Sequence, residues 1–335
     1  MRRLPVYLLI DCSESMAGAA IETVNTAVQG MVRDLRATPH ALETVAMSVI
    51  AFSDDARLVV PLTSIEMFQL PALTIRAGTS LGRALDLLAS CVSTDVVKTT
   101  KERKGDWRPL VFLFTDGQPT DDWHEAAERL KNLTSPKIAN IYAIGCGNDV
   151  DFSVLHEITD IVLRTADADA EAIRKAFVWI TASVQSASAG VGEGADRLPE
   201  LGDDSALKEV PKGEYTPESE PRQVFINARC SKTKGHYLMR FVRATEEGPY
   251  VAKAAHKLEA CDVGFGARLP PVQSSRLAGV PACPYCGNGS AAVCGCGGVM
   301  CIDMRKPDGV ACPHCGIVQQ GGFTAGNFDV RQSAG

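Results

Sequence analysis

The sequence lacks any apolar run long enough for a helix to cross a bilayer, although 45% of its 335 residues are hydrophobic. Its beginning, Met1-Arg2-Arg3 followed by a short apolar stretch that ends at Ile10, is too brief for a secretory signal and lacks a cleavage site of small residues. These absences favour a soluble protein.

A surplus of one charge is also missing. The 34 Lys and Arg residues against 40 Asp and Glu residues give a formal net charge of −6. That balance gives no reason to expect the whole molecule to be attracted to nucleic acid or membranes, so any basic patch must be local. The length is too great for one ordinary core and indicates about two domains.

A disulfide pattern is absent despite 12 cysteines. Seven of them lie after residue 280 at spacings typical of metal ligands, and the others are scattered singly through apolar segments. This distribution favours a reducing cytoplasm and bound zinc.

The first part of the chain alternates between strand-like and helix-like segments. Residues 6–10 and 110–115 are continuous apolar runs, typical of strands covered on both faces, and Ser53-Asp54-Asp55 marks a hairpin between strands. The other predicted elements are strands over 44–52, 58–62, 137–144 and 161–164, and helices over 21–35, 81–91, 121–133, 152–158 and 173–184. A polar excursion covers 93–108. The alternation predicts an α/β, doubly wound, mostly parallel sheet over residues 1–187.

Asp11, Ser13 and Ser15 follow the first predicted strand at alternate positions. Residues two apart on an extended backbone project from the same side, so these three can offer hard oxygen ligands that suit Mg²⁺ or Mn²⁺. Taken alone, the same string is also compatible with a helix cap or a turn.

Thr79 and Asp116 supply two further oxygens at loop junctions. Asp116 ends the fourth predicted strand, which in this kind of sheet lies beside the central first strand. Because ligands bind at the carboxyl ends of strands where the strand order reverses, topology predicts that Asp11 and Asp116 share one crevice.

The five residues together resemble the metal-ion-dependent adhesion site of von Willebrand factor type A domains. The resemblance implies a site that leaves one metal position open for an Asp or Glu from a protein partner. It implies no enzymatic activity.

Residues 188–221 are rich in Gly, Pro and acids, and they are interpreted as a flexible acidic linker in which Thr216 or Ser219 could be phosphorylated. Residues 222–335 are predicted to form a small β-rich zinc-ribbon domain. Six basic residues gather around two predicted strands at 224–226 and 237–242, namely Arg222, Arg229, Lys232, Lys234, Arg240 and Arg243. A solvated strand face is favoured for them over an anion-binding or nucleic-acid surface.

Two copies of a zinc knuckle, Cys283-Pro-Tyr-Cys286-Gly and Cys312-Pro-His-Cys315-Gly, are present in this domain. We expect the four thiolates to share one closed, tetrahedral zinc site. Spacing leaves open whether Cys294, Cys296 and Cys301 bind a second ion with His314 or another ligand, or replace one knuckle. The irregularly spaced Cys230, His236, His256 and Cys261 are interpreted as structural or surface residues.

The whole arrangement resembles the TerY family of tellurite-resistance-associated proteins. The supporting segments are 11–15, 225–233 and the tail from Cys283 through Cys294-Gly-Cys296-Gly and Cys301-Ile-Asp to Cys315. The resemblance implies a cytoplasmic bacterial adaptor in stress response, associated with a protein kinase and a PP2C-type phosphatase.

Two other functions are considered. A Mg²⁺-dependent phosphohydrolase of the haloacid dehalogenase type also uses an Asp after the first strand, but it needs a second acid where this chain has Ser13. Asp121 and Asp122 could mimic its late acidic pair, although no suitably placed Lys precedes them. A zinc ribbon that binds nucleic acid is the other alternative.

Overall fold

The computed structural model describes residues 2–147, 150–165, 169–190, 207–213, 223–243, 245, 248–258, 270–305, 310–319 and 327–332. These residues divide into two compact units, one mainly before residue 213 and one mainly after residue 223. In the part of the chain so described, no helix combines the length and apolar character that a membrane crossing requires.

A seven-stranded sheet in the order β3-β2-β1-β4-β5-β6-β7 forms the centre of the first unit. Neighbouring strands from β2 through β6 are parallel, and β3 and β7 are antiparallel edge strands. The strands are β1 (Leu4–Asp11), β2 (Val45–Phe52), β3 (Ala56–Ser64), β4 (Leu110–Thr115), β5 (Asn140–Cys146), β6 (Ile161–Thr165) and β7 (Leu207–Glu209). The predicted doubly wound sheet is confirmed, with β1 central and β4 beside it.

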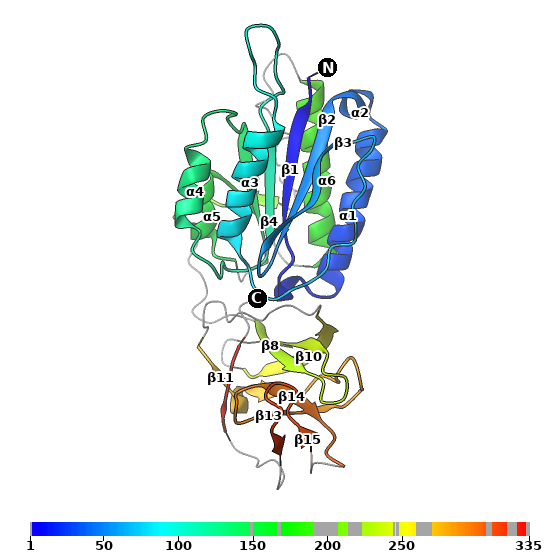
Figure 1. Cartoon of the computed structure of the whole chain (residues 1–335), viewed down its shortest axis with the longest axis vertical. Coiled ribbons are helices and arrows are strands. Elements are labelled where there is room, and N and C mark those ends of the chain that lie inside the picture. Colours follow the sequence, from blue (N-terminus) through cyan, green and yellow to red (C-terminus); the bar gives the residue numbers. More distant parts are fainter. Residues whose placement is uncertain are drawn as a thin grey trace. The chain divides into compact units, whose positions relative to one another are not determined.

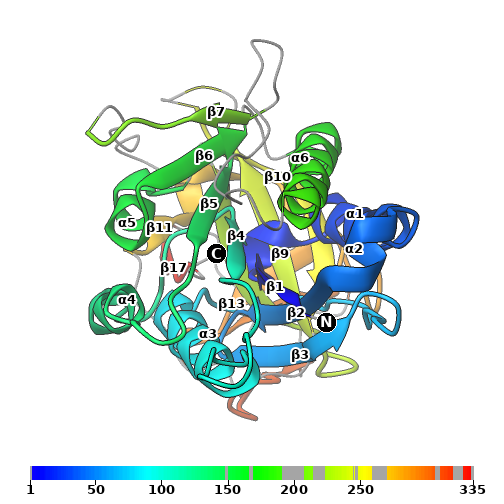
Figure 2. The same ribbon diagram turned by 90° about the horizontal axis from the view of Figure 1, so that it is seen from above.

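Helices cover both faces of this sheet. One face carries α1 (Ala19–Arg36), α2 (Pro39–Thr44) and α6 (Ala170–Ala189), and the other carries α3 (Leu81–Asp95), α4 (His124–Lys131) and α5 (Phe152–Ile158), as Figure 2 shows. Because both faces are covered, every residue of β1, β2 and β4 is buried, which explains the uninterrupted apolar runs in the sequence.

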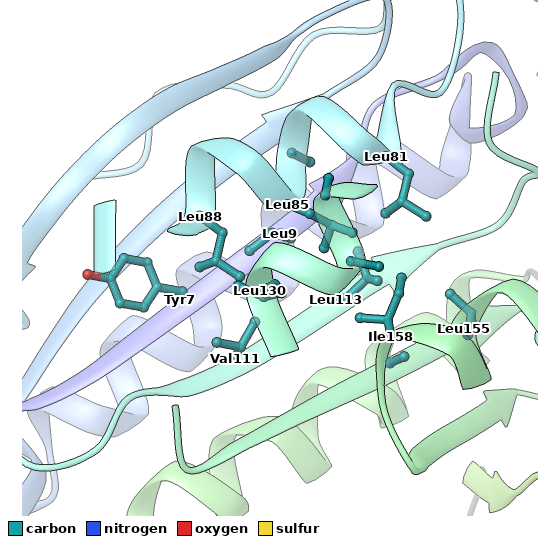
Figure 3. Close-up of a cluster of buried hydrophobic side chains, with 14 of the residues drawn as sticks. Tyr7, Leu9, Leu81, Leu85, Leu88, Val111, Leu113, Leu130, Leu155 and Ile158 are labelled. Atoms are coloured by element: carbon teal, nitrogen blue, oxygen red, sulfur yellow. The ribbon is translucent and has the colours of Figure 1, made fainter. Parts of the chain in front are cut away.

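Leucines of α3 form much of one core layer. Leu81, Leu85 and Leu88 recur at helical spacing and point at Leu9 of β1 and Leu113 of β4, as seen in Figure 3. Leu130 of α4 and Leu155 and Ile158 of α5 extend the same cluster. This packing fixes the start of α3, and therefore Thr79, relative to the ends of β1 and β4.

Strand β7 lies inside the segment predicted to be a flexible linker. Its Leu207 pairs with Thr165 of β6 and is buried, and the Val210 N–H donates to the Val162 carbonyl at 2.9 Å. Together with α6, which continues to Ala189, this strand corrects the predicted boundary: residues 207–210 belong to the first sheet. The predicted phosphorylation sites Thr216 and Ser219 lie outside the described residues.

The second unit is built on a six-stranded sheet in the order β12-β10-β9-β8-β14-β13. The predicted strands at 224–226 and 237–242 are the antiparallel pair β8 and β9. The strands of the sheet are β8 (Gln223–Arg229), β9 (His236–Val242), β10 (Tyr250–Lys257), β12 (Leu277–Ala278), β13 (Ser290–Val293) and β14 (Val299–Ile302). Two small sheets pair β11 (Val272–Gln273) with β17 (Asp329–Val330), and β15 (Val310–Ala311) with β16 (Val318–Gln319).

Candidate metal sites

The first candidate site forms where β1 and β4 end side by side. The two strands are in parallel register, with Ile10 opposite Phe114, so Asp11 and Asp116 follow at the same edge of the sheet. A short 3-10 turn, η1 (Glu14–Met16), carries Ser15 back over this edge. The Ser15 hydroxyl donates to Asp116 Oδ1 at 2.5 Å, which joins two segments 101 residues apart.

Asp11 is fully buried and both of its carboxylate oxygens are held. Oδ1 accepts the Ser13 N–H at 2.9 Å, and Oδ2 accepts the Thr115 hydroxyl at 2.5 Å. The hydroxyl oxygens of Ser13 and Ser15 lie 2.9 Å apart. Four of the five predicted ligands are therefore brought together by direct hydrogen bonds.

The buried carboxylate of Asp11 has no ion-pair partner among the described residues. Burial raises the pKa of Asp11 above its ordinary value, although hydrogen bonds from Ser13 and Thr115 act in the opposite direction. A small hard cation bound to oxygen ligands would compensate for this buried charge, so the residues fit the predicted divalent ion.

Thr79 is positioned by the loop that follows Asp116. Its N–H donates to the Thr120 hydroxyl at 3.0 Å, and its carbonyl accepts the Thr120 N–H at 2.9 Å. The turn before it depends on Gly78, whose φ is +86°. Thr79 also lines a shallow cavity together with Thr115, the hydroxyl donor to Asp11. The fifth predicted residue therefore lies close to the side chain that orients Asp11.

Asp121 stabilises the start of α3 next to this site. Its carboxylate accepts the N–H groups of Gly82 and Arg83, both at 3.1 Å, which satisfies amides that a helix leaves unpaired at its first turn. A Cβ at position 82 would lie 2.6 Å from the Asp122 carbonyl, so only Gly fits there. Sequence spacing gave no signal for the roles of Thr120 and Asp121.

The second and third candidate sites are two clusters of four cysteines. Cys230, Cys283, Cys286 and Cys301 form cluster A, and Cys294, Cys296, Cys312 and Cys315 form cluster B; within each cluster all sulfur atoms lie within 4.8 Å of one another. The expectation that Cys283, Cys286, Cys312 and Cys315 share one site is therefore wrong, because each knuckle is completed by a different pair of cysteines.

The sulfur spacing matches zinc coordination. Measured sulfur separations are 3.6 Å for Cys286 and Cys301 in cluster A and 3.7 Å for Cys294 and Cys315 in cluster B. A tetrahedron with zinc–sulfur bonds of about 2.3 Å has edges of about 3.8 Å, whereas a disulfide needs about 2.05 Å. No disulfide joins any of the described cysteines. Both clusters therefore fit a closed four-sulfur zinc site.

Both knuckles use the same turn. The Gly287 N–H donates to the Cys283 carbonyl at 2.8 Å and the Gly316 N–H donates to the Cys312 carbonyl at 2.9 Å. The φ angles of the two glycines are +76° and +78°, as expected for a knuckle glycine.

Cys230 begins a third turn of this kind. The Lys234 N–H donates to the Cys230 carbonyl at 2.8 Å, and Lys234 has a φ of +61°. In this turn Thr233 stands where a knuckle has its second cysteine, so no Cys-x-x-Cys spacing marks it in the sequence. This explains why Cys230 was wrongly interpreted as a merely structural or surface residue.

The pKa of a thiol is lowered in each cluster. Burial opposes ionisation of Cys230, but hydrogen bonds from Thr233 and the backbone outweigh it and lower its pKa to about 6. A backbone hydrogen bond at Cys296 lowers the pKa of Cys294 to about 7. Burial raises the pKa of Cys283 and Cys312 to about 12. Because the thiolate is the form that binds metal, Cys230 and Cys294 are the thiols best prepared for a first bond.

The β13–β14 hairpin connects the clusters. Cys294 and Cys296 lie in its turn and belong to cluster B, whereas Cys301 of β14 belongs to cluster A. His314 is not a member of either cluster: its Nε2 lies 2.8 Å from the Val299 carbonyl, which secures the second knuckle to β14. Arg229 donates to the Pro313 carbonyl at 3.1 Å. His236 and His256 lie on β9 and β10, and Cys261 is outside the described residues.

Comparison with known proteins finds matches in both units. A model of the von Willebrand factor type A domain matches residues 6–176, and a model of the TerY-C metal binding domain matches residues 267–335. An uncharacterized protein of Synechocystis sp. is 28% identical over 166 residues, which cover 47% of this chain and 36% of that protein.

Two solved structures are similar to part of this chain. The pilus adhesin SpaC from Lactobacillus rhamnosus GG, in an open conformation, is 15% identical with a TM-score of 0.44, over 56% of this chain and 30% of that one. The ArnB paralog VWA2 from Sulfolobus acidocaldarius is 17% identical with a TM-score of 0.39, over 52% of this chain and 45% of that one.

Proposed function

Since the chain belongs to the von Willebrand factor type A domain family and carries a TerY-C metal binding domain behind it, we propose that it is a metal-dependent adaptor that holds protein partners together. Domains of the first kind are generally interaction modules without enzymatic activity. The proposal assigns binding to the first unit and a zinc-stabilised structural role to the second.

The hydrogen bond between Ser15 and Asp116 is the observation that carries the proposal, because it joins the ends of β1 and β4 at the buried Asp11. Asp11 and Asp116 provide the negative charge that would hold Mg²⁺ or Mn²⁺. Ser13, Ser15 and Thr79 provide neutral oxygens, and Thr115 fixes the orientation of the Asp11 carboxylate.

Partner binding follows from this donor set. Such an ion, when bound, offers a coordination position that a partner's Asp or Glu carboxylate can take. The five residues of the site would thus provide one charged, largely desolvated contact at the centre of the interface with a partner protein. A partner lacking that carboxylate would leave the contact unmade, so the arrangement supports selective binding.

Clusters A and B would each hold one Zn²⁺. Four thiolates complete a tetrahedral zinc shell and leave no position for substrate or water, so the sites are structural and not catalytic. Cysteines that form no disulfide and are grouped as metal ligands are typical of a reducing compartment, which supports a cytoplasmic location.

The partners proposed are a Ser/Thr protein kinase and a PP2C-type phosphatase in a bacterial stress-response system of the tellurite-resistance type. The TerY-C match supports this assignment, because resemblance to the TerY family implies association with such a kinase and phosphatase. An adaptor that holds a kinase and its opposing phosphatase would place both enzymes on the same substrates.

The two alternative functions lose support. For a phosphohydrolase, Asp121 would have to serve the reaction, yet its carboxylate is engaged with the amides of α3. For nucleic-acid binding by the β-rich unit, the strand arginines would have to be available, yet Arg229 bonds to Pro313 and Arg240 bonds to Gln223. Arg243 is buried and lies over the Tyr250 ring.

Titration of the zinc-loaded full-length protein with Mn²⁺ tests the metal site, with free Mn²⁺ followed by electron paramagnetic resonance. We expect Asp11→Ala to weaken Mn²⁺ binding at least about tenfold, because a charged ligand is lost. Asp122→Ala is the matched control, since that neighbouring carboxylate is 80% exposed and, among the described residues, is bonded to His124. Equal Mn²⁺ affinity in the Asp11→Ala and wild-type proteins would refute the proposal.

Capture of the kinase and the phosphatase from a bacterial lysate then tests the partners. Capture by the wild-type chain should require added Mg²⁺ or Mn²⁺ and should fail for Asp11→Ala but not for Asp122→Ala. Capture that is indifferent to both the ion and the substitution would show that these enzymes do not bind through the metal site.

A further inference from the structure

A basic finger extends from the first unit between α3 and β4. It comprises residues 97–108 and is the loop drawn in cyan above the start of β4 in Figure 1. Glu102 is exposed on it, and so are five basic side chains, Lys98, Lys101, Arg103, Lys104 and Arg108. In a chain with a net charge of −6, this is a local concentration of positive charge.

The finger has a defined conformation. The Asp106 N–H donates to the Val97 carbonyl at 2.8 Å, and the Val97 N–H donates to Asp106 Oδ2 at 3.0 Å. Nearer the tip, the Thr100 N–H donates to the Arg103 carbonyl at 2.9 Å. A Cβ on Gly105 would lie 2.2 Å from the Val97 carbonyl oxygen, so the two sides of the finger are in close contact.

Two arginines from the start of the chain anchor the base of the finger. Arg3 forms an ion pair with Asp106 at 2.6 Å, and the Asp106 side chain is only 5% exposed. Arg2 donates to the Gly105 carbonyl at 2.7 Å and stacks over the Trp107 ring at 3.5 Å. These contacts neutralise the second acid of the finger and place a guanidinium over its one aromatic ring, which is half-buried. The exposed charges that remain are five basic side chains against one acid.

The finger and the candidate adhesion site lie at opposite ends of the same strands, β1 and β4. Arg3 precedes β1 and the finger precedes β4, whereas Asp11 and Asp116 come at the carboxyl ends of the same two parallel strands. A partner bound at the adhesion site therefore does not block the finger, and the reverse also holds. An adaptor for two partners requires this geometry.

We propose that the basic finger binds an acidic protein segment, a short run of carboxylates on a second partner. Lysine side chains suit this role because their ammonium groups act as point charges on flexible stems and need no fixed geometry. A nucleic acid is disfavoured for two reasons. The finger offers no exposed aromatic side chain for base stacking, and a long polyanion would approach the net negative charge of the rest of the chain.

Fluorescence anisotropy with a labelled octaglutamate peptide tests this inference on the full-length, zinc-loaded protein. The test variant replaces Lys98, Lys101, Arg103 and Lys104 with Glu. The matched control replaces four exposed basic residues elsewhere, Arg174, Lys175, Lys208 and Lys253, with Glu, so that both variants have the same net charge. A DNA duplex of equal charge serves as the competing probe.

We expect the finger variant to bind the peptide at least about tenfold more weakly than wild type, and the control within about twofold, because exposed charge pairs act over short distances in salt. Equal loss in both variants would overturn the inference, and so would tighter binding of the DNA duplex than of the peptide. Asp11→Ala should bind the peptide like wild type, so failure here and failure of the metal-site proposal are distinguishable.

Discussion

The two units of the chain are stabilised in different ways. In the first unit, a sheet covered on both faces is packed against a continuous apolar cluster drawn from five strands and three helices. In the second, the apolar clusters are smaller and cysteines are part of them; the buried ones are Cys230, Cys283, Cys294, Cys301 and Cys312. We therefore expect the first unit to fold around its apolar core without a metal ion, and the second unit to depend on bound metal ions for folding.

Loss of one cluster ligand should separate the two units most clearly. We expect Cys301→Ser to destabilise the second unit by several kcal/mol, because structural zinc sites contribute about 10–16 kcal/mol of apparent binding free energy. We also expect zinc to be lost from cluster B, because Cys301 lies on the hairpin that carries Cys294 and Cys296. Zinc content and thermal melting measure both effects.

Cys91→Ala is the control for this experiment, since Cys91 is a buried residue of α3 outside both clusters. It should retain two zinc ions per chain. Tryptophan fluorescence follows the first unit alone, because all three tryptophans, Trp107, Trp123 and Trp179, lie there. A Cys301→Ser protein with unchanged zinc content would contradict the assignment of cluster A.

A substitution in the core of the first unit should instead destabilise that unit and leave the zinc content unchanged. Leu85→Ala removes a side chain that is 1% exposed from the layer between α3 and the sheet, and it should destabilise the first unit by about 2–5 kcal/mol. Denaturant unfolding followed by tryptophan fluorescence measures this loss. Zinc content should not change, and release of zinc by this variant would show that the units do not fold independently.

The Asp106 ion pair should give a smaller, pH-dependent effect. Burial alone would raise the pKa of Asp106, but hydrogen bonds from Arg3 and Val97 outweigh it and lower that pKa. Asp106 therefore binds a proton less readily in the folded state than in the unfolded chain. Its contribution to stability is present above the ordinary pKa of an aspartate, and it is lost as the pH falls through the pKa of Asp106 in the folded state. Asp106→Asn should cost about 1–3 kcal/mol near neutral pH.

Thermal melting of the first unit between neutral and acidic pH measures this difference. The gap between Asp106→Asn and wild type should close in acid, when Asp106 is protonated in both states. A gap of constant size across the pH range would mean that the side chain contributes through packing and not through its charge.

The smallest expected effect lies in the turn after Cys230. Lys234 has a φ of +61°, which is unfavourable for a residue with a Cβ, so Lys234→Gly should stabilise the second unit by up to about 1 kcal/mol. Resistance of cluster A to a competing chelator is the measurement. Greater ease of zinc removal would show that the Lys side chain makes a contact worth more than the relieved strain.

Much of the first unit was predictable from the sequence because two physical rules apply to it directly. Strands 6–10 and 110–115 are apolar without alternation, which occurs when helices cover both faces. Once those strands are parallel neighbours, Asp11 and Asp116 must lie at one edge. Strand β7 escaped prediction because Leu-Lys-Glu is too short for periodicity and the surrounding composition is that of a linker.

The cysteine pairing could not be predicted in the same way. A Cys-x-x-Cys knuckle shows that two sulfurs can face one ion, but it carries no information about which distant sulfurs complete the shell. That choice depends on the parallel pairing of β8 with β14, which brings the Cys230 turn beside Cys301. Parallel pairing between segments so far apart leaves no local signal.

The ligands of the two clusters are interleaved along the chain, because Cys294 and Cys296 of cluster B precede Cys301 of cluster A. This order has a consequence for synthesis of the protein on the ribosome. A ribosome releases the first unit with nearly all of its core, but cluster A stays incomplete until Cys301 has emerged and cluster B until Cys315 has emerged. The nascent tail therefore carries incompletely ligated thiols until translation is almost finished. In a cell short of zinc, we expect chains whose first unit is folded and whose second unit is unfolded and open to proteases.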